Sequence, residues 1–93
     1  MTIINKGKEI KLPEMGGTLY VVDNSDYILP MFVSLTEVKI TRAGILLRCD
    51  NLRTRIFSYY SADELGETLF VDRDEAEKTL EKRKKEKEAK EAV

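Results

Sequence analysis

The alternation of hydrophobic and polar residues predicts a chain of short strands after residue 16. Residues 18–22 are β-branched, aromatic or leucine, and the polar residues 23–26 that follow are typical of a turn. Further strands are expected at residues 31–40, 45–49, 52–60 and 68–71, with a turn at 41–44. Asp50 and Asn51 are expected to close a hairpin between the third and fourth strands.

The second strand changes the side on which its hydrophobic residues lie. One parity is shared by Met31, Val33 and Leu35, and the other by Val38 and Ile40. Because side chains alternate strictly along a strand, this change predicts a bulge or sharp bend at Thr36 and Glu37. Pro30 cannot donate to a ladder, so it is expected at the start of this strand or on an edge.

Two helical segments follow the hairpin. Residues 61–66 resemble a single helical turn that ends at a glycine. Asp72 and Glu75 have the spacing of a capping box, with Val71 and Ala76 placed as a hydrophobic staple. This pattern predicts a helix that starts at Arg73.

That helix has a short apolar side. Ala76 and Leu80 lie one turn apart and can dock the helix on the body, whereas residues 81–90 contain one apolar residue, Ala89. We therefore expect the end of the helix to leave the body. Residues 82–85 are all basic, but they point around most of the helix and acids interrupt the charge, which favours a solvated helix over a nucleic-acid patch.

These elements predict a mainly β, α+β fold: a small five-stranded barrel with one C-terminal helix. We expect an N-terminal arm at residues 1–16 with a short strand at most, the barrel at 17–72, and the charged helix at 73–93. The chain has 93 residues, of which 42% are hydrophobic, which suits one domain with a small core.

Composition limits partners and location. The chain has 16 basic and 17 acidic residues, and its net charge of -1 gives no field that favours DNA or an anionic membrane. The longest apolar stretch, residues 27–35, is too short to span a bilayer, and residues 1–12 lack the apolar centre of a signal peptide. We expect a cytoplasmic protein without membrane contact.

The residue types argue against an enzyme. The absence of histidine removes the commonest general base near neutral pH. Cys49 is the single cysteine, so no intramolecular disulfide or thiolate zinc cluster can form, and we expect it to be a buried small hydrophobe. The acids of residues 63–67 have no neighbouring nucleophile, and residues 72–75 lack the pattern of a calcium loop. We predict no catalytic residue, no metal ligand and no cofactor.

One surface is a candidate for binding. A turn at Asp50 and Asn51 pairs Cys49 with Leu52, Leu47 with Thr54, and Ile45 with Ile56, and these six residues form the core side. The opposite side carries Leu46 and the expected partner-binding residues, Arg48, Arg53, Arg55, Phe57 and Tyr59. Arg48 would face Arg53, and like charges across a ladder are unfavourable, which suggests a partner. An acidic protein or a nucleic acid with stacked bases would suit this face, and so would an ordinary exposed face quenched by neighbouring acids.

Residues 64–71 (ELGETLFV) and 73–80 (RDEAEKTL) resemble the ending of small, uncharacterised phage and prophage proteins, mostly from Firmicutes. A strand like residues 17–22 precedes that ending in those proteins, so the resemblance covers residues 17–80. It implies an SH3-like barrel with an appended helix, a mobile-element origin and a bacterial host cell. It brings no catalytic residue.

Together these observations lead to two expectations of function. The first is a non-enzymatic module that binds a host or phage protein, with inhibition of a bacterial defence system such as a CRISPR effector as its role. The alternative is a small nucleic-acid-binding barrel. The sequence leaves the partner and the oligomeric state open.

Overall fold

The computed structural model describes residues 1–22 and 29–91, so the turn predicted at residues 23–26 lies outside the described residues. In chain order the elements are β1 (Thr2–Asn5), β2 (Lys8–Lys11), β3 (Thr18–Val21), β4 (Met31–Thr41), β5 (Gly44–Asn51), β6 (Ile56–Ser61), the 3-10 turn η1 (Ala62–Glu64), β7 (Leu69–Phe70) and α1 (Arg73–Glu91). None of the helices in these residues is long and apolar enough to cross a membrane.

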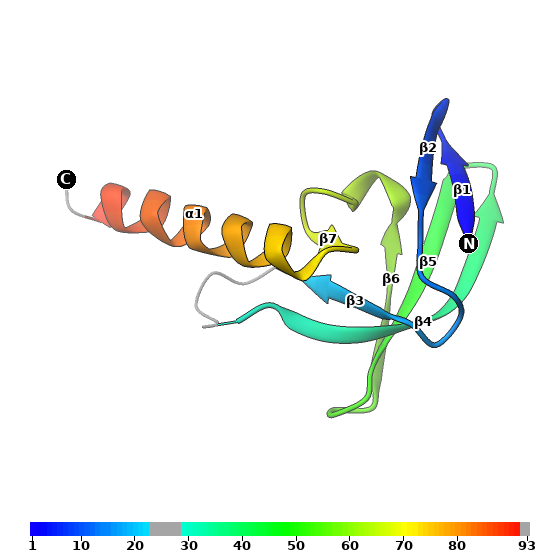
Figure 1. The fold of residues 1–93 in the computed structure, drawn as a ribbon, viewed down its shortest axis with the longest axis horizontal. Coiled ribbons are helices and arrows are strands. Elements are labelled where there is room, and N and C mark those ends of the chain that lie inside the picture. Colours follow the sequence, from blue (N-terminus) through cyan, green and yellow to red (C-terminus); the bar gives the residue numbers. More distant parts are fainter. Residues whose placement is uncertain (23–28, 92–93) are drawn as a thin grey trace.

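Five strands form one antiparallel sheet in the order β6-β5-β4-β3-β7. The sheet curls into a half-barrel, and α1 leaves it at the end that carries β3 and β7 (Figure 1). These strands correspond to the five that the hydrophobic pattern predicts. The predicted mainly β fold, with a small barrel-like sheet and one C-terminal helix, is confirmed.

The N-terminal segment contains two strands, where the sequence indicated one at most. β1 and β2 form a separate antiparallel hairpin, in which Ile3 pairs with Ile10. Lys6 and Gly7 make its turn with φ angles of 53° and 78°, the left-handed conformations that a tight two-residue hairpin turn requires. Ile3 and Ile10 pack against the main core, so this hairpin covers one side of the curled sheet.

The bulge predicted in the long strand is confirmed. Along β4, Leu35 pairs with Cys49 and Glu37 pairs with Arg48, which leaves Thr36 as an extra residue between two consecutive pairs. The bulge keeps Leu35 and Val38 on the same side of the sheet although their parity differs. Pro30 lies directly before the first residue of β4, as expected.

The two sides of the sheet carry separate apolar clusters. We call the concave side the inner face; its buried residues are Leu12, Leu19, Val21, Val33, Leu35, Leu47, Cys49 and Leu69. The other side is the outer face, where Val22 and Phe70 pack against Ala76 and Leu80 of α1. Because these contacts involve β3 and β7, the helix covers one end of the outer face, and β4, β5 and β6 continue beyond it.

Helix α1 begins at Arg73, as the capping pattern predicts. The Oδ1 atom of Asp72 accepts a hydrogen bond of 2.9 Å from the main-chain N–H of Asp74. The predicted hydrophobic staple of Val71 with Ala76 was wrong, because Val71 is exposed and Phe70 packs in the cluster with Ala76 instead. Beyond Arg83, whose side chain still reaches the sheet, the helix projects away from the body (Figure 1).

The predicted helical turn at residues 61–66 is also confirmed. The Ser61 hydroxyl accepts from the N–H of Asp63, and Glu64 Oε2 accepts from the N–H of Ser61 at 3.0 Å, which completes a capping box. Gly66 follows with a φ of 91°. This turn connects β6 to β7.

The hairpin between β5 and β6 differs from the prediction. Residues 52–55 form its loop, and Cys49 pairs with Ser58, six residues beyond the predicted partner Leu52. The side chain of Asn51 accepts hydrogen bonds from the N–H groups of Arg53 and Thr54, which stabilises a wide loop in place of a two-residue turn. The predicted pairs of Cys49, Leu47 and Ile45 with residues 52–56 were therefore wrong.

The error in pairing changes the expected core. Leu52 and Ile56 were assigned to the core side, but they are 76% and 66% exposed, and Thr54 lies in the loop. Leu47 and Cys49 are buried as expected.

Candidate functional site

Three of the five predicted binding residues come together on the outer face. Arg48 on β5 pairs with Tyr59 on β6, and the neighbouring pair on the same side is Asp50 with Phe57. The observed ladder is displaced by an even number of residues from the predicted one, so each side chain of β6 keeps its predicted side. Arg48, Phe57 and Tyr59 therefore share a face, as the sequence indicated.

These three side chains form one contact cluster. The guanidinium carbon of Arg48 lies 4.0 Å from the ring centroid of Phe57, a cation–π geometry. The rings of Phe57 and Tyr59 meet edge to face, with centroids 5.9 Å apart and an angle of 89° between the planes. The cluster is held in place by contacts within the sheet, so its shape is set before any partner arrives.

Acids lie beside the arginine. Nε of Arg48 is 3.0 Å from Oδ1 of Asp50, which also accepts a hydrogen bond of 3.0 Å from the hydroxyl of Thr36 at the bulge. The hydrogen bond to Asp50 raises the pKa of Arg48, and the negative charges of Asp50 and Glu37 add to this effect. Neighbouring acids thus balance the charge of Arg48, one of the arrangements that the sequence left open.

A second arginine–aromatic cluster lies on the same face, nearer to the helix. Tyr20 and Phe32 pair across β3 and β4, and their rings meet edge to face at 5.5 Å. The guanidinium carbon of Arg73, at the start of α1, lies 5.6 Å from the Phe32 centroid. Sequence reasoning missed this cluster because it depends on the register between β3 and β4 and on where the helix begins.

Arg53 and Arg55 do not join Arg48. Both lie in the loop at residues 52–55, and both are exposed. Arg55 has a φ of 60° and its N–H donates to the carbonyl of Asn51 at 2.7 Å, so it ends the loop in a left-handed conformation. The residue opposite Arg48 is Tyr59, and the predicted pair of Arg48 with Arg53 was wrong.

An open groove of about 890 Å³ lies beside this loop. It is lined by Gly16, Thr18, residues 29–34 and residues 51–54. Among these residues Arg53 is the one charged side chain, and the remaining polar groups are hydroxyls and the amide of Asn51. The groove therefore combines apolar side chains with a few hydroxyl, amide and guanidinium groups, a lining typical of surfaces that bind a ligand.

Cys49 is buried, as expected. Its side chain belongs to the inner core, and burial raises the pKa of the thiol to about 12. The thiolate, which is the reactive form, is therefore strongly disfavoured at neutral pH. Within residues 1–22 and 29–91, no group of three or more Asp, Glu or Cys side chains is arranged to hold a metal ion.

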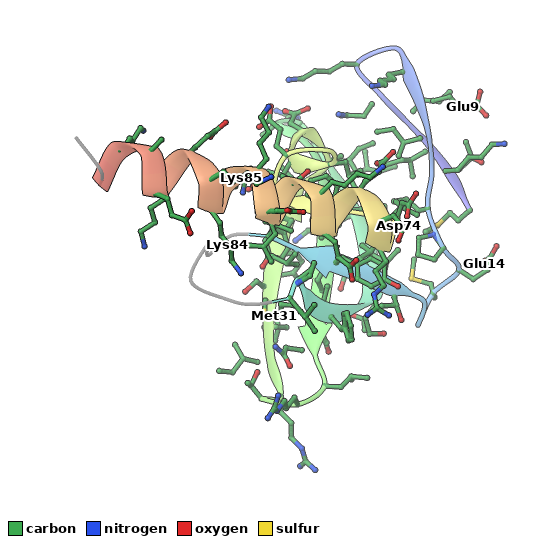
Figure 2. All side chains as sticks on the ribbon, turned by 60° about the vertical axis from the view of Figure 1, so that its left-hand side comes forward. Glu9, Glu14, Met31, Asp74, Lys84 and Lys85 are labelled. Carbon is green, nitrogen blue, oxygen red and sulfur yellow. The ribbon has the colours of Figure 1, made fainter. Side chains whose placement is uncertain are left out.

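The basic run at residues 82–85 does not form one patch. Arg83 turns toward the sheet and donates to the main-chain carbonyls of Val22 and Glu67. Figure 2 shows Lys84 and Lys85 directed to different sides of α1, and Lys85 pairs with Glu81 at 3.5 Å. Comparison of the chain with family models, curated proteins and solved structures finds no match, so the geometry of the outer face carries the functional argument.

Proposed function

We propose that this chain is a non-enzymatic binding module that contacts another protein through the outer face of its sheet. The observation that carries the proposal is the cluster of Arg48, Phe57 and Tyr59 on the part of that face beyond α1. Phe57 and Tyr59 remain 49% and 43% exposed although they pack against each other. Aromatic and arginine side chains are the residues that most often dominate protein–protein binding energy.

The charges on this face favour a protein over a nucleic acid. Asp50 forms an ion pair with Arg48, and Glu37 lies beside Arg48 on the neighbouring strand. A phosphate that approached the cluster would therefore meet two carboxylates. The protein also has a net charge of -1. Backbone phosphate contacts supply most of the affinity of non-specific nucleic-acid binding, and this face is poorly suited to them.

One observation favours the alternative, a small nucleic-acid-binding barrel. Arg53 and Arg55 project in an exposed loop, and Leu52 beside them is exposed as well. Such a loop could contact phosphates with its two cations. This loop joins β5 to β6 and is not part of the arginine–aromatic cluster, so the two functions depend on different residues.

The resemblance to phage and prophage proteins guides the choice of partner. Under that resemblance the partner is a host or phage protein in a bacterial cytoplasm, and inhibition of a defence system is the role we propose for the complex. The outer face supports this proposal as a preformed surface of exposed aromatic side chains.

The test compares three forms of the full chain coupled to resin. These are the unmodified chain, the double variant Phe57→Thr with Tyr59→Thr, and a matched control, Ile40→Thr. Ile40 is an apolar strand residue that is 81% exposed at the far end of β4, and threonine preserves strand propensity at all three positions. Circular dichroism and melting curves establish that each variant is folded. The measurement is the set of lysate proteins retained by each form, identified by mass spectrometry.

We expect a protein that the unmodified chain and Ile40→Thr retain and that the double variant loses by at least tenfold. Equal retention by all three forms would contradict the proposal. A parallel measurement uses labelled single-stranded and duplex oligonucleotides at low and high salt. Binding that falls steeply with salt and is lost on Arg53→Glu would favour the nucleic-acid alternative.

A further inference from the structure

Strand β6 is an edge strand without the usual protection against pairing. It ends the strand order and pairs with β5 on one side. Its sequence, Ile56–Ser61, contains neither a charged residue nor a proline, and its first four residues are exposed. Natural proteins commonly protect such edges with charges, prolines, bulges or covering segments. An uncharged, aromatic, exposed edge therefore indicates that something pairs with it.

The outward backbone groups of β6 can be assigned. In an antiparallel ladder the N–H and C=O of alternate residues point to opposite sides of the strand. The N–H of Ser61 donates to Glu64 Oε2, which shows that this residue directs its backbone away from β5. Phe57 and Tyr59 share its parity, so their N–H and C=O groups point outward along the same edge. The side chain of Glu64 accepts from the outward N–H of Ser61, whereas the outward backbone groups of Phe57 and Tyr59 lie along the edge before it.

We propose that a second copy of this chain pairs with β6 along this edge. The antiparallel arrangement has a two-fold axis at Ser58, so that Phe57 of one copy pairs with Tyr59 of the second, and each pair exchanges two backbone hydrogen bonds. Ser58 then faces Ser58 of the second copy at the position where side chains approach most closely, and a small residue suits that position. The two sheets become one continuous sheet.

Side-chain complementarity supports this register. On the inner side it places Ile56, which is well exposed in the single chain, opposite Tyr60 of the second copy. On the outer side it places Phe57 opposite Tyr59, and aromatic cross-strand pairs are among the favourable ones. The exposed apolar residues of β6 thus gain partners on both sides of the extended sheet.

Charge complementarity points to a second copy in preference to an unrelated strand. The loop before β6 carries Arg53 and Arg55, whereas the turn after β6 carries Glu64 and Asp63, of which Asp63 also binds Lys6. An antiparallel pair of β6 strands brings Arg55 level with Ser61 of the second copy, beside these acids. The two-fold axis creates this opposite-charge contact twice, and a parallel pairing would place like charges together.

This inference goes beyond the proposed function and does not depend on it. The side chains of Phe57 and Tyr59 stay on the outer face when their backbone pairs with the second copy. Pairing therefore brings the Arg48, Phe57 and Tyr59 clusters of the two copies together into one larger surface and leaves that surface exposed. A failure to find a protein partner would leave the self-pairing untouched, because the two are measured separately.

The test uses charge at the two-fold axis. Ser58→Lys and Ser58→Glu each place like charges opposite each other in a homodimer, whereas a mixture of the two variants places opposite charges there. Ser58 is exposed, so neither change disturbs the core. Thr2→Lys, on the exposed side of β1, is the matched control. The measurement is the mass by sedimentation equilibrium over a concentration series, starting from a single-chain mass of 10.7 kDa.

We expect the unmodified chain and Thr2→Lys to approach twice that mass as concentration rises. Each Ser58 variant alone should remain at the single-chain mass, with dimerisation weakened at least tenfold, and the mixture should regain the dimer. The proposal would be overturned by an unmodified chain that stays monomeric to its solubility limit, by variants that dimerise like the unmodified chain, or by a mixture that stays monomeric. Melting curves of each variant establish that loss of the dimer is not loss of the fold.

Discussion

Arg83 on α1 donates a hydrogen bond to the main-chain carbonyl of Val22, 61 residues earlier in the chain. A second N–H of the same guanidinium donates to the carbonyl of Glu67. Val22 lies just after β3 and Glu67 lies just before β7, so one side chain joins the helix to two parts of the sheet edge. Together with Ala76 and Leu80, Arg83 completes a stripe along one side of the helix at the spacing of four and then three residues.

Replacing Arg83 should destabilise the protein, whereas replacing its neighbour should not. Arg83→Ala leaves two carbonyls without their charged donor, and we expect a loss of about 1 to 3 kcal/mol in the free energy of unfolding. In a domain of this size that corresponds to a fall in Tm of at least about 4 °C. Lys82→Ala removes an exposed cation from the same helix and is the control. Equal effects of the two changes, measured by thermal denaturation, would show that the guanidinium does not hold the helix.

The observed register of β5 and β6 predicts a specific order of core effects. Leu47 is fully buried, so Leu47→Ala should cost about 2 to 5 kcal/mol. Leu52 and Ile56 are exposed, and replacing either by alanine should cost less than about 1 kcal/mol in the single chain. Urea unfolding at low protein concentration measures all three. A large loss for Leu52→Ala would instead support the two-residue turn at Asp50 and Asn51.

Cys49 should make the protein less stable in alkali. Its pKa is raised to about 12 by burial, whereas the exposed thiol of the unfolded chain ionises near 9. Below about pH 9 the thiol is protonated in both states, and its contribution is fully present. As pH rises toward 12 the unfolded chain releases the proton first, so the free energy of unfolding falls by up to about 1.4 kcal/mol per pH unit. Urea unfolding at several pH values should give a shallower slope for Cys49→Ala, and parallel slopes would contradict this assignment.

Asp63 connects the N-terminal hairpin to the turn after β6. Its carboxylate accepts from Nζ of Lys6 and from the amide of Asn5, both at 2.8 Å, and the hydrogen bond from Lys6 is the main cause of its lowered pKa. The stabilisation is present above the ordinary pKa of an aspartate and is lost as pH falls through the lowered value. An NMR titration should show the pKa of Asp63 rising in Lys6→Gln and unchanged in Lys8→Gln. No difference between the two variants would mean that the contact does not form in solution.

Much of the fold follows from local patterns. The parity change around Thr36, the capping residue Asp72 and the apolar pair Ala76 and Leu80 each act within a few residues, and each feature is present as predicted. The hairpin β1–β2 was missed as a pair because its turn, Lys6 and Gly7, lies among charged residues and its strands bury few side chains each.

The candidate site was predicted in part, for a physical reason. Asp50 and Asn51 have turn chemistry, but the side chain of Asn51 can equally well stabilise a longer loop, and the core selects between the two. The observed β5–β6 ladder is displaced from the predicted one by an even number of residues, so Arg48, Phe57 and Tyr59 share a face as predicted. Arg53 and Arg55 lie in the loop between the two strands instead. The contacts of Arg73 and Arg83 join distant segments, and no local pattern in the sequence specifies them.

The projecting half of α1 offers a practical attachment point. After Arg83 the helix continues to Glu91, about 12 Å further at 1.5 Å per residue, and Ala89 and Lys90 there are exposed. A fluorophore or a surface tether attached through the substitution Ala89→Cys would sit near the C-terminal end of α1, the helix that projects from the sheet in Figure 1. Cys49 would not compete for the label, because its thiol is buried. The chain thus carries its own rigid spacer, by which it can be immobilised with both the outer face and the β6 edge left free.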